Sequence, residues 1–167
     1  MLKKISFKEI NNYKDSFSLF SDSQVALVKA DDIVNPITIG WGLIGILWNK
    51  PCLCLFIHKS RFSKQLFDKA NSFSLCVLKD EYRKYLEYFG RVSGRCENKV
   101  EVSSLEVSYS NDTPYFVESD LVIIAKKMTE TCFNTAIIND ERILNWYKKD
   151  GVHSIYFGEI IEVLRSE

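Results

Sequence analysis

Short apolar runs separated by turn-forming residues recur along the whole chain and predict mainly β-strands. A continuous apolar run indicates a strand covered on both faces, and an alternating run indicates one buried face. In a long last strand, Ile155, Phe157, Ile161 and Val163 are expected to share one face. Six or more short strands bounded by turn residues favour a closed barrel or a sandwich. The other expected strands are Val25–Val28, Pro36–Gly40, Cys52–Ile57, Phe73–Val77, Leu105–Tyr109 and Leu121–Ala125.

Three helical patterns interrupt these strands. One begins just after Ser60, one has Asp80 as its expected N-cap and a stop at Gly90, and one is capped by Asp140 and ends near Gly151. Because helices and strands do not alternate regularly, a doubly wound parallel sheet is disfavoured. The core-facing positions are Phe62, Leu66, Phe67 and Ala70 in the first helix, and Tyr82, Tyr85, Leu86 and Phe89 in the second.

Length and charge narrow the class of protein. The 167 residues suit one domain, here residues 1–167, with no repeat or linker. Lys and Arg together equal Asp and Glu at 22 each, so neither nucleic acid nor an anionic membrane is an expected partner. The longest apolar stretch, Ile39–Trp48, is too short to span a bilayer, and the N-terminus lacks the pattern of a signal peptide. We therefore expect a soluble, cytoplasmic protein.

The five cysteines give no sign of a disulfide framework or of a metal site. They are scattered, odd in number and without a Cys-x-x-Cys pair, and only His58 and His153 could join them as ligands. Cys52 and Cys54 stand two apart in an apolar run, so they are expected on one face of a strand as small hydrophobic residues.

The segment Gly40–Gly45 matches the G-x-G-x-x-G dinucleotide fingerprint, but its context excludes that interpretation. The motif needs a helix that begins within it and an acidic residue about 20 positions further on. Here the chain reaches Pro51 without room for such a helix, and no acidic residue lies between Asp32 and Asp68. The glycines are better explained by a bent strand, or by backbone that approaches a flat ligand.

Three segments carry candidate chemistry. Asn35–Gly42 offers glycine-flanked backbone, and Arg91–Lys99 is a basic loop with hydroxyl groups. In His58–Ser63 a strand gives way to a helix, so hydroxyls, the Arg61 guanidinium and free helix N–H groups would converge as they do in phosphate sites. Each segment taken singly is more often a helix cap or a solvated loop.

Taken together, in this order and spacing, the segments resemble the flavin reductase-like, FMN-binding split-barrel family. The departures are Phe62, Ser63, Asn98 and Phe89, where the family usually has Tyr, Thr, Asp and Cys. The matching motifs are Asn35, Thr38, Trp41-Gly42 and Leu47–Pro51, then Arg61-Phe62-Ser63, then Ser93-Gly94-Arg95 with Lys99, and finally Trp146-Tyr147 and His153–Ile160.

The resemblance implies a mainly β fold, a Greek-key split β-barrel with a few peripheral α-helices, that dimerises and binds FMN near the subunit interface. It implies a phosphate held by Ser60, Arg61, Ser63 and Lys99, with the ring edge along the backbone of Thr38 to Trp41. The resemblance implies no catalytic side chain and no metal site. The full expected cofactor-binding set is Asn35, Thr38, Ile39, Gly40, Trp41, His58, Ser60, Arg61, Ser63, Ser93, Gly94, Arg95 and Lys99.

Two activities share this pocket, and the sequence does not separate them. One is NAD(P)H-dependent reduction of flavin or of another small electron acceptor, and the alternative is an FMN electron carrier reduced by a partner protein. A third hypothesis is a barrel that has lost flavin binding and binds another planar ligand. Trp41, Trp48 and Phe62 around the glycine-bent segment predict an apolar patch, and with it a homodimer.

Overall fold

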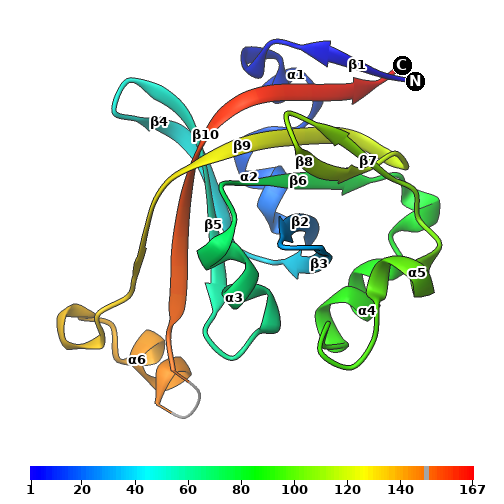
Figure 1. Ribbon diagram of the computed structural model, residues 1–167. Coiled ribbons are helices and arrows are strands. Elements are labelled where there is room, and N and C mark those ends of the chain that lie inside the picture. The colour runs from blue at the N-terminus through cyan, green and yellow to red at the C-terminus, as the bar shows by residue number, and fades with distance from the viewer. Residues whose placement is uncertain (149–150) are drawn as a thin grey trace.

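The computed structural model describes residues 1–148 and 151–167, and its dominant feature is one large antiparallel sheet (Figure 1). The strands are β1 (Leu2–Ile5), β2 (Gln24–Ala30), β3 (Ile33–Ile39), β4 (Gly42–Leu47), β5 (Lys50–His58), β6 (Ser72–Leu78), β9 (Ser119–Cys132) and β10 (His153–Ser166). A separate two-stranded ribbon is formed by β7 (Val107–Ser110) and β8 (Thr113–Phe116). The fold is therefore mainly β, as the hydrophobic pattern predicts.

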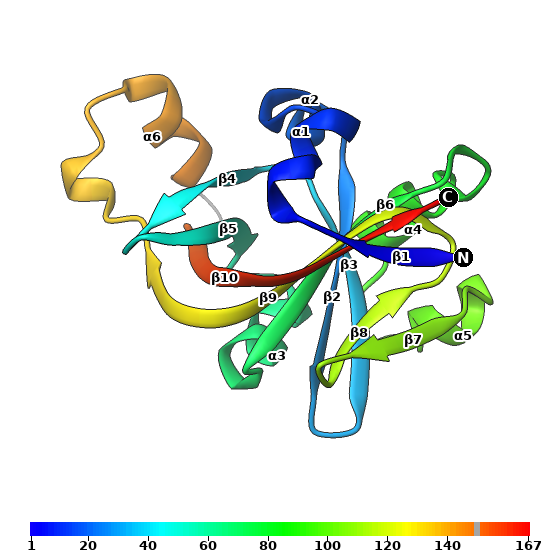
Figure 2. The same ribbon diagram turned by 90° about the horizontal axis from the view of Figure 1, so that it is seen from above.

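The large sheet is strongly curved but not closed. Its strands follow the order β3–β2–β6–β9–β10–β5–β4, and β1 pairs with β10. The two end strands, β3 and β4, are consecutive in the chain but are not hydrogen-bonded to each other. Figure 2 shows β9 and β10 bending around the middle of the molecule. The expected split barrel is thus supported only in part, and closure of the sheet is not observed.

The last strand does not keep one face toward the core, so that prediction is wrong. β10 shifts register against β9 between Phe157 and Gly158, and again between Ile160 and Glu162. Tyr156, Ile160 and Val163 belong to the main core, whereas Ile161 is exposed. A bulge inserts a residue without a partner and reverses which alternate residues face inward.

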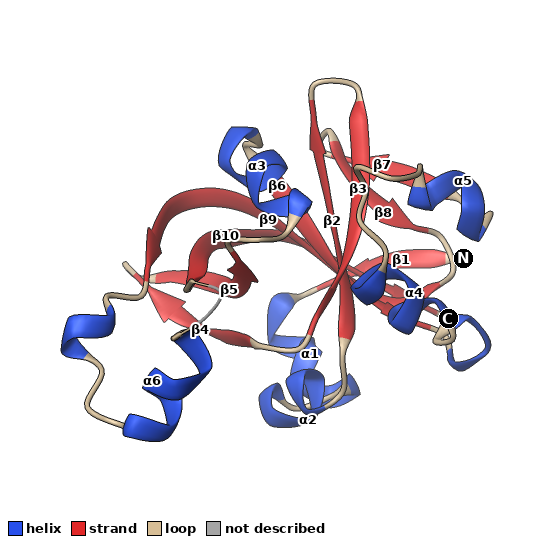
Figure 3. Ribbon diagram, turned by 90° about the horizontal axis from the view of Figure 1, so that it is seen from below, coloured by secondary structure: helices blue, strands red, loops and turns tan. Residues whose placement is uncertain are grey.

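Six α-helices surround the sheet in the described ranges, 1–148 and 151–167 (Figure 3). The first expected helix is confirmed as α3, where Leu66 and Phe67 are buried. The third is confirmed as α6, whose N-cap Asp140 accepts from the Arg142 N–H, although α6 ends before Gly151. The helices are α1 (Ile10–Tyr13), α2 (Ser16–Ser21), α3 (Phe62–Lys69), α4 (Tyr85–Arg91), α5 (Lys99–Ser103) and α6 (Glu141–Tyr147).

The second expected helix is shorter than predicted. Asp80 opens a 3-10 turn that ends at Tyr82, and α4 begins only at Tyr85. Gly90 does not stop the helix, because it lies inside α4 without a positive φ angle. A Cβ atom there would stand 3.4 Å from Thr38, an ordinary van der Waals contact, so the packing of α4 on β3 does not itself require glycine. The basic loop also contains the start of a further helix, α5, that the pattern did not indicate.

The core divides into two clusters on the two sides of the central strands. Ala26 and Val28 of β2 belong to one cluster, and Val25 and Leu27 belong to the other, so this strand is covered on both faces. Cys52 and Cys54 are both buried on one face of β5, also as predicted. The expected strand at Leu105–Tyr109 begins at Val107 and lies in the separate ribbon. No helix in the described part of the chain is long and apolar enough to cross a membrane.

Candidate functional site

The end of β5 and the start of α3 bring three of the expected site residues together. His58 ends β5, and its Nδ1 lies 2.8 Å from the Ser60 hydroxyl. The other ring nitrogen, Nε2, lies 2.9 Å from the carbonyl oxygen of Gly151. Arg61 precedes α3, and its guanidinium donates to the carbonyl of Gly90 at 2.8 Å. These hydrogen bonds fix the junction against α4 and the start of β10.

A small cavity of about 110 Å³, called here the cationic cavity, opens at this junction. Its polar lining consists of cations and hydroxyl groups, and none of its lining residues is acidic. Such a lining suits a dianion, because charged donors and hydroxyls can converge on its oxygens. The lining residues are Ile37, Ser60, Arg61, Phe62, Ser63, Phe89, Val92, Ser93, Gly94 and Lys99.

Lys99 is the buried cation of this cavity. Only 3% of its surface is exposed, and its ammonium donates to the carbonyl of Phe89 at 3.2 Å. Burial, followed by the nearby Arg61 charge, lowers the pKa of Lys99 to about 8. No ion pair in the described part of the chain includes Lys99. A buried ammonium without a carboxylate partner is unfavourable by itself and is stabilised by an added anion.

A second cavity, of about 190 Å³, adjoins the first and is called here the strand-end cavity. Arg61 and Ile37 line both cavities, so a single ligand can extend from one to the other. The end of β3 and Gly40 form one wall, and the nearest atom to a Cβ added at Gly40 would be the Ser23 hydroxyl oxygen at 4.0 Å. The lining residues are Ile37, Thr38, Ile39, Gly40, Trp41, Phe56, Ile57, His58, Arg61 and His153.

His153 is a site residue that the sequence reasoning missed. It pairs with His58 across the β5–β10 ladder, and its ring lies 4.6 Å from the Trp41 ring. Its Nδ1 is buried and has no hydrogen-bond partner. Burial, with smaller effects from His58 and Arg61, lowers the pKa of His153 to about 4. Its motif was visible in the last strand, but only the strand register shows that it meets His58.

Two of the expected residues line neither cavity. Asn35 is buried, and its amide donates to the Ser63 hydroxyl at 2.7 Å. Gly94 packs so closely on it that an added Cβ would stand 2.1 Å from the Asn35 oxygen. Arg95 instead covers the Phe62 ring at 5.1 Å. Asn35 can therefore position Ser63 and the Gly94 loop, whereas Arg95 lies outside the two cavities.

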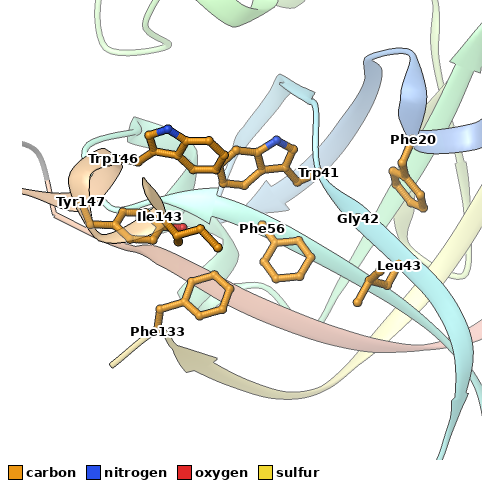
Figure 4. Close-up of a pocket in the computed structure, with 9 residues that line it drawn as sticks. All are labelled: Phe20, Trp41, Gly42, Leu43, Phe56, Phe133, Ile143, Trp146 and Tyr147. Carbon is orange, nitrogen blue, oxygen red and sulfur yellow. The ribbon is translucent and has the colours of Figure 1, made fainter. Parts of the chain in front are cut away.

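A third, larger cavity of about 370 Å³, called here the aromatic pocket, lies next to the strand-end cavity (Figure 4). The two cavities share Trp41 and Phe56. Trp41 stacks with Trp146 of α6 at 5.7 Å between ring centroids, and Phe56 stacks with Phe133 at 5.8 Å. The lining residues are Phe20, Trp41, Gly42, Leu43, Phe56, Phe133, Ile143, Trp146 and Tyr147.

Known proteins share this fold. Residues 21–167 match the family model described as "Flavin reductase like domain". No curated protein matches the chain.

Three solved structures illustrate the similarity. Flavoredoxin from Methanosarcina acetivorans is 20% identical with a TM-score of 0.70, over 87% of this chain and 68% of its own. An FMN-binding domain of flavin reductase-like enzymes from Shewanella baltica is 12% identical with a TM-score of 0.72, over 99% and 77%. An NADH:FAD oxidoreductase from Streptomyces globisporus is 13% identical with a TM-score of 0.63, over 86% and 75%.

Proposed function

Because the chain belongs to the flavin reductase-like domain family, we propose that it is a flavoprotein oxidoreductase that holds FMN across the two adjoining cavities. The observation that carries the proposal is the position of Arg61, which lines both the cationic cavity and the strand-end cavity. A ligand with a phosphate at one end and a flat ring at the other matches this arrangement. The FMN-binding domain from Shewanella baltica, which has a similar fold, supports the same choice of cofactor.

In this proposal the phosphate occupies the cationic cavity. Ser60, Arg61 and Lys99 donate to its oxygens, and Ser63 and Ser93 line the same space. Asn35 lies outside the cavity and positions the Ser63 hydroxyl, to which its side-chain amide donates a hydrogen bond. A cavity of about 110 Å³ suits a terminal phosphate, which favours FMN over FAD.

The ring system is placed along the backbone of Thr38 to Trp41 in the strand-end cavity. The Thr38 hydroxyl is already engaged, since it donates to the Leu86 carbonyl at 2.5 Å, so backbone groups are left to meet the ring edge. His153 faces the same cavity as a neutral imidazole, because its pKa is lowered to about 4. When bound, the flavin would supply the electron-transfer chemistry. The chain's own residues would hold, orient and shield it, without an essential acid or base.

The electron donor separates two versions of this function. NAD(P)H as donor would make the protein an enzyme that reduces flavin or another small acceptor, the activity of the similarly folded NADH:FAD oxidoreductase. A protein donor would make it an electron carrier, and the similar fold of flavoredoxin favours that second candidate. Anaerobic mixing of the FMN-loaded protein with NADH or NADPH distinguishes them. Rapid bleaching of the flavin absorbance supports the enzyme, and indifference to both nucleotides supports the carrier.

We also propose that the whole chain acts as one domain within a homodimer. Leu43, Ile46 and Trp48 on and after β4, the end strand of the sheet, are 61%, 69% and 64% exposed, which makes an apolar edge suited to a second copy. Phe62 does not extend this edge, because it packs against the core beneath Arg95.

The proposed cofactor is tested by comparing FMN with riboflavin in a fluorescence-quenching titration of the purified protein. The two ligands share the ring and differ by the phosphate. Tighter binding of FMN is expected, since only FMN can use Arg61 and Lys99. Equal affinities would contradict a phosphate site in the cationic cavity.

A further inference from the structure

We propose that the aromatic pocket binds an uncharged, planar ring compound, and that this is the class of second substrate taken by the proposed flavoprotein. That this compound is a substrate rests on the proposed function, whereas the binding site itself is inferred from the geometry of the pocket. Its volume of about 370 Å³ lies within the range of small-molecule sites, about 300–1,000 Å³.

Two stacked aromatic pairs give the pocket its shape. Trp41 and Trp146 form one pair, and Phe56 and Phe133 form the other, with the Phe rings only 4° from parallel. Figure 4 shows the two indoles side by side on one side of the phenylalanines, with both indole nitrogens directed away from them. The surfaces left for a ligand are therefore carbon faces and edges, which favour another flat ring through stacking and edge-to-face contact.

The lining also sets the charge of the ligand. None of the nine lining residues is acidic or basic, so a charged group inside the pocket would lose part of its hydration without gaining an ion pair. The cations of the site, Arg61 and Lys99, line the neighbouring cavities and not this one. An ionised ring compound or a pyrophosphate is therefore disfavoured in this space.

One polar group remains inside the pocket. The Tyr147 hydroxyl is directed from α6 toward the middle of the pocket (Figure 4), and the residue is 9% exposed. Burial raises the pKa of Tyr147, so the hydroxyl keeps its proton and can donate to a ligand oxygen. This favours a neutral ring that carries a carbonyl or a hydroxyl.

The position of the pocket connects the ligand with the proposed cofactor site. Trp41 and Phe56 form a wall common to the aromatic pocket and the strand-end cavity. A ring held between the aromatic pairs would lie next to the flavin ring and away from its phosphate. The site that holds the cofactor and the site that holds the second ring are thus separate but adjoining.

The test uses two probes of nearly equal shape, neutral 2-naphthol and negatively charged 2-naphthoate, in calorimetric titrations of the FMN-loaded protein at neutral pH. We expect 2-naphthol to bind and 2-naphthoate to bind far more weakly. Trp146→Ala should weaken 2-naphthol binding by about tenfold, as loss of a stacked aromatic wall does. Phe17→Ala is the control, since Phe17 is an exposed aromatic residue outside the pocket, and it should leave the affinity unchanged.

Three results would overturn the inference: equal binding of the two probes, equal effects of the two substitutions, or no 2-naphthol binding. If 2-naphthol fails to bind and Trp146→Ala instead lowers the dimer fraction in sedimentation, the pocket is an interface between copies. An FMN titration of the same proteins keeps the proposals apart. If the wild-type chain binds FMN but not 2-naphthol, only this inference is contradicted. If the wild-type chain does not bind FMN, the proposed function is contradicted.

Discussion

His58 and His153 face each other across the ladder between β5 and β10, with their ring centroids 4.9 Å apart. Because burial holds the pKa of His153 near 4, we expect His153 to remain neutral at neutral pH and to gain its proton only in acid. NMR of the imidazole C–H signals against pH measures this directly. An apparent pKa for His153 near the ordinary 6.5 would contradict the packing described for it.

The same shift predicts a loss of stability in acid. The unfolded chain binds a proton at His153 as the pH falls through 6.5, whereas the folded chain binds it only near 4. The unfolded state therefore holds more protons in this window, and His153 lowers the free energy of unfolding as the pH falls from 6.5 toward 4. Urea denaturation over this range should show a smaller pH dependence for His153→Gln than for the wild type.

Arg61→Ala should weaken FMN binding by about 1.5–3 kcal/mol, the usual scale for a lost charge-assisted hydrogen bond. The matched control is Lys59→Ala, because Lys59 is an exposed cation two positions away that lines neither cavity. Fluorescence titrations of both variants give the comparison. If the two substitutions weaken FMN binding equally, Arg61 is only a solvated surface charge and not part of a phosphate site.

FMN affinity should fall as the pH rises through about 8. The pKa of Lys99 is lowered to about 8, so its charge is lost above that pH and one partner of the phosphate disappears. By the same linkage, phosphate binding should raise the pKa of Lys99 and take up a proton near this pH. Lys99→Met should bind FMN more weakly at pH 7 and lose this pH dependence. Riboflavin serves as the control ligand, because without a phosphate it should not show the Lys99-dependent decrease.

Gly158→Ala should destabilise the fold by about 1–3 kcal/mol, as overpacking of a core does. A Cβ atom at Gly158 would stand 2.7 Å from Ala125 and 2.8 Å from Phe73, so strands β9 and β6 would have to move. Gly45→Ala in β4 is the matched control, since nothing lies within 4 Å of its added Cβ. Urea denaturation should separate the two variants, and equal midpoints would contradict the described packing.

Added FMN should raise both the melting temperature and the dimer fraction at low micromolar protein, if the cofactor binds the assembled form better than the monomer. The expected contact region is the exposed edge at β4, with Leu43, Ile46 and Trp48. Sedimentation with and without FMN measures the dimer fraction. A clean monomer that holds FMN stoichiometrically would contradict a pocket shared between copies.

Local sequence was sufficient for most of the strands, although not for β1, β4 and β8, and it anticipated much of the candidate site. Val25–Val28 and Cys52–Ile57 were correctly predicted as strands, because a strand buried on both faces is a continuous run of apolar residues. The cationic cavity was also anticipated in large part, since Ser60, Arg61 and Ser63 are close in the chain and a strand-to-helix junction places them together. Both features depend on residues that are close together in the chain, so a local sequence pattern can predict them.

What only the tertiary structure decided depends on register and on contacts between distant segments. The extra residue of β10 at Ile161 exchanged its inner and outer faces, because one residue without a partner reverses the alternation of a strand. His153 became a site residue only through its pairing with His58, and Trp146 became a pocket wall only by stacking on Trp41. Sequence by itself determined most of the central strands, two of the helices and the family motifs that they carry. Strand register and packing across the sheet decided which side chains meet, because residues far apart in the chain leave no local trace of their pairing.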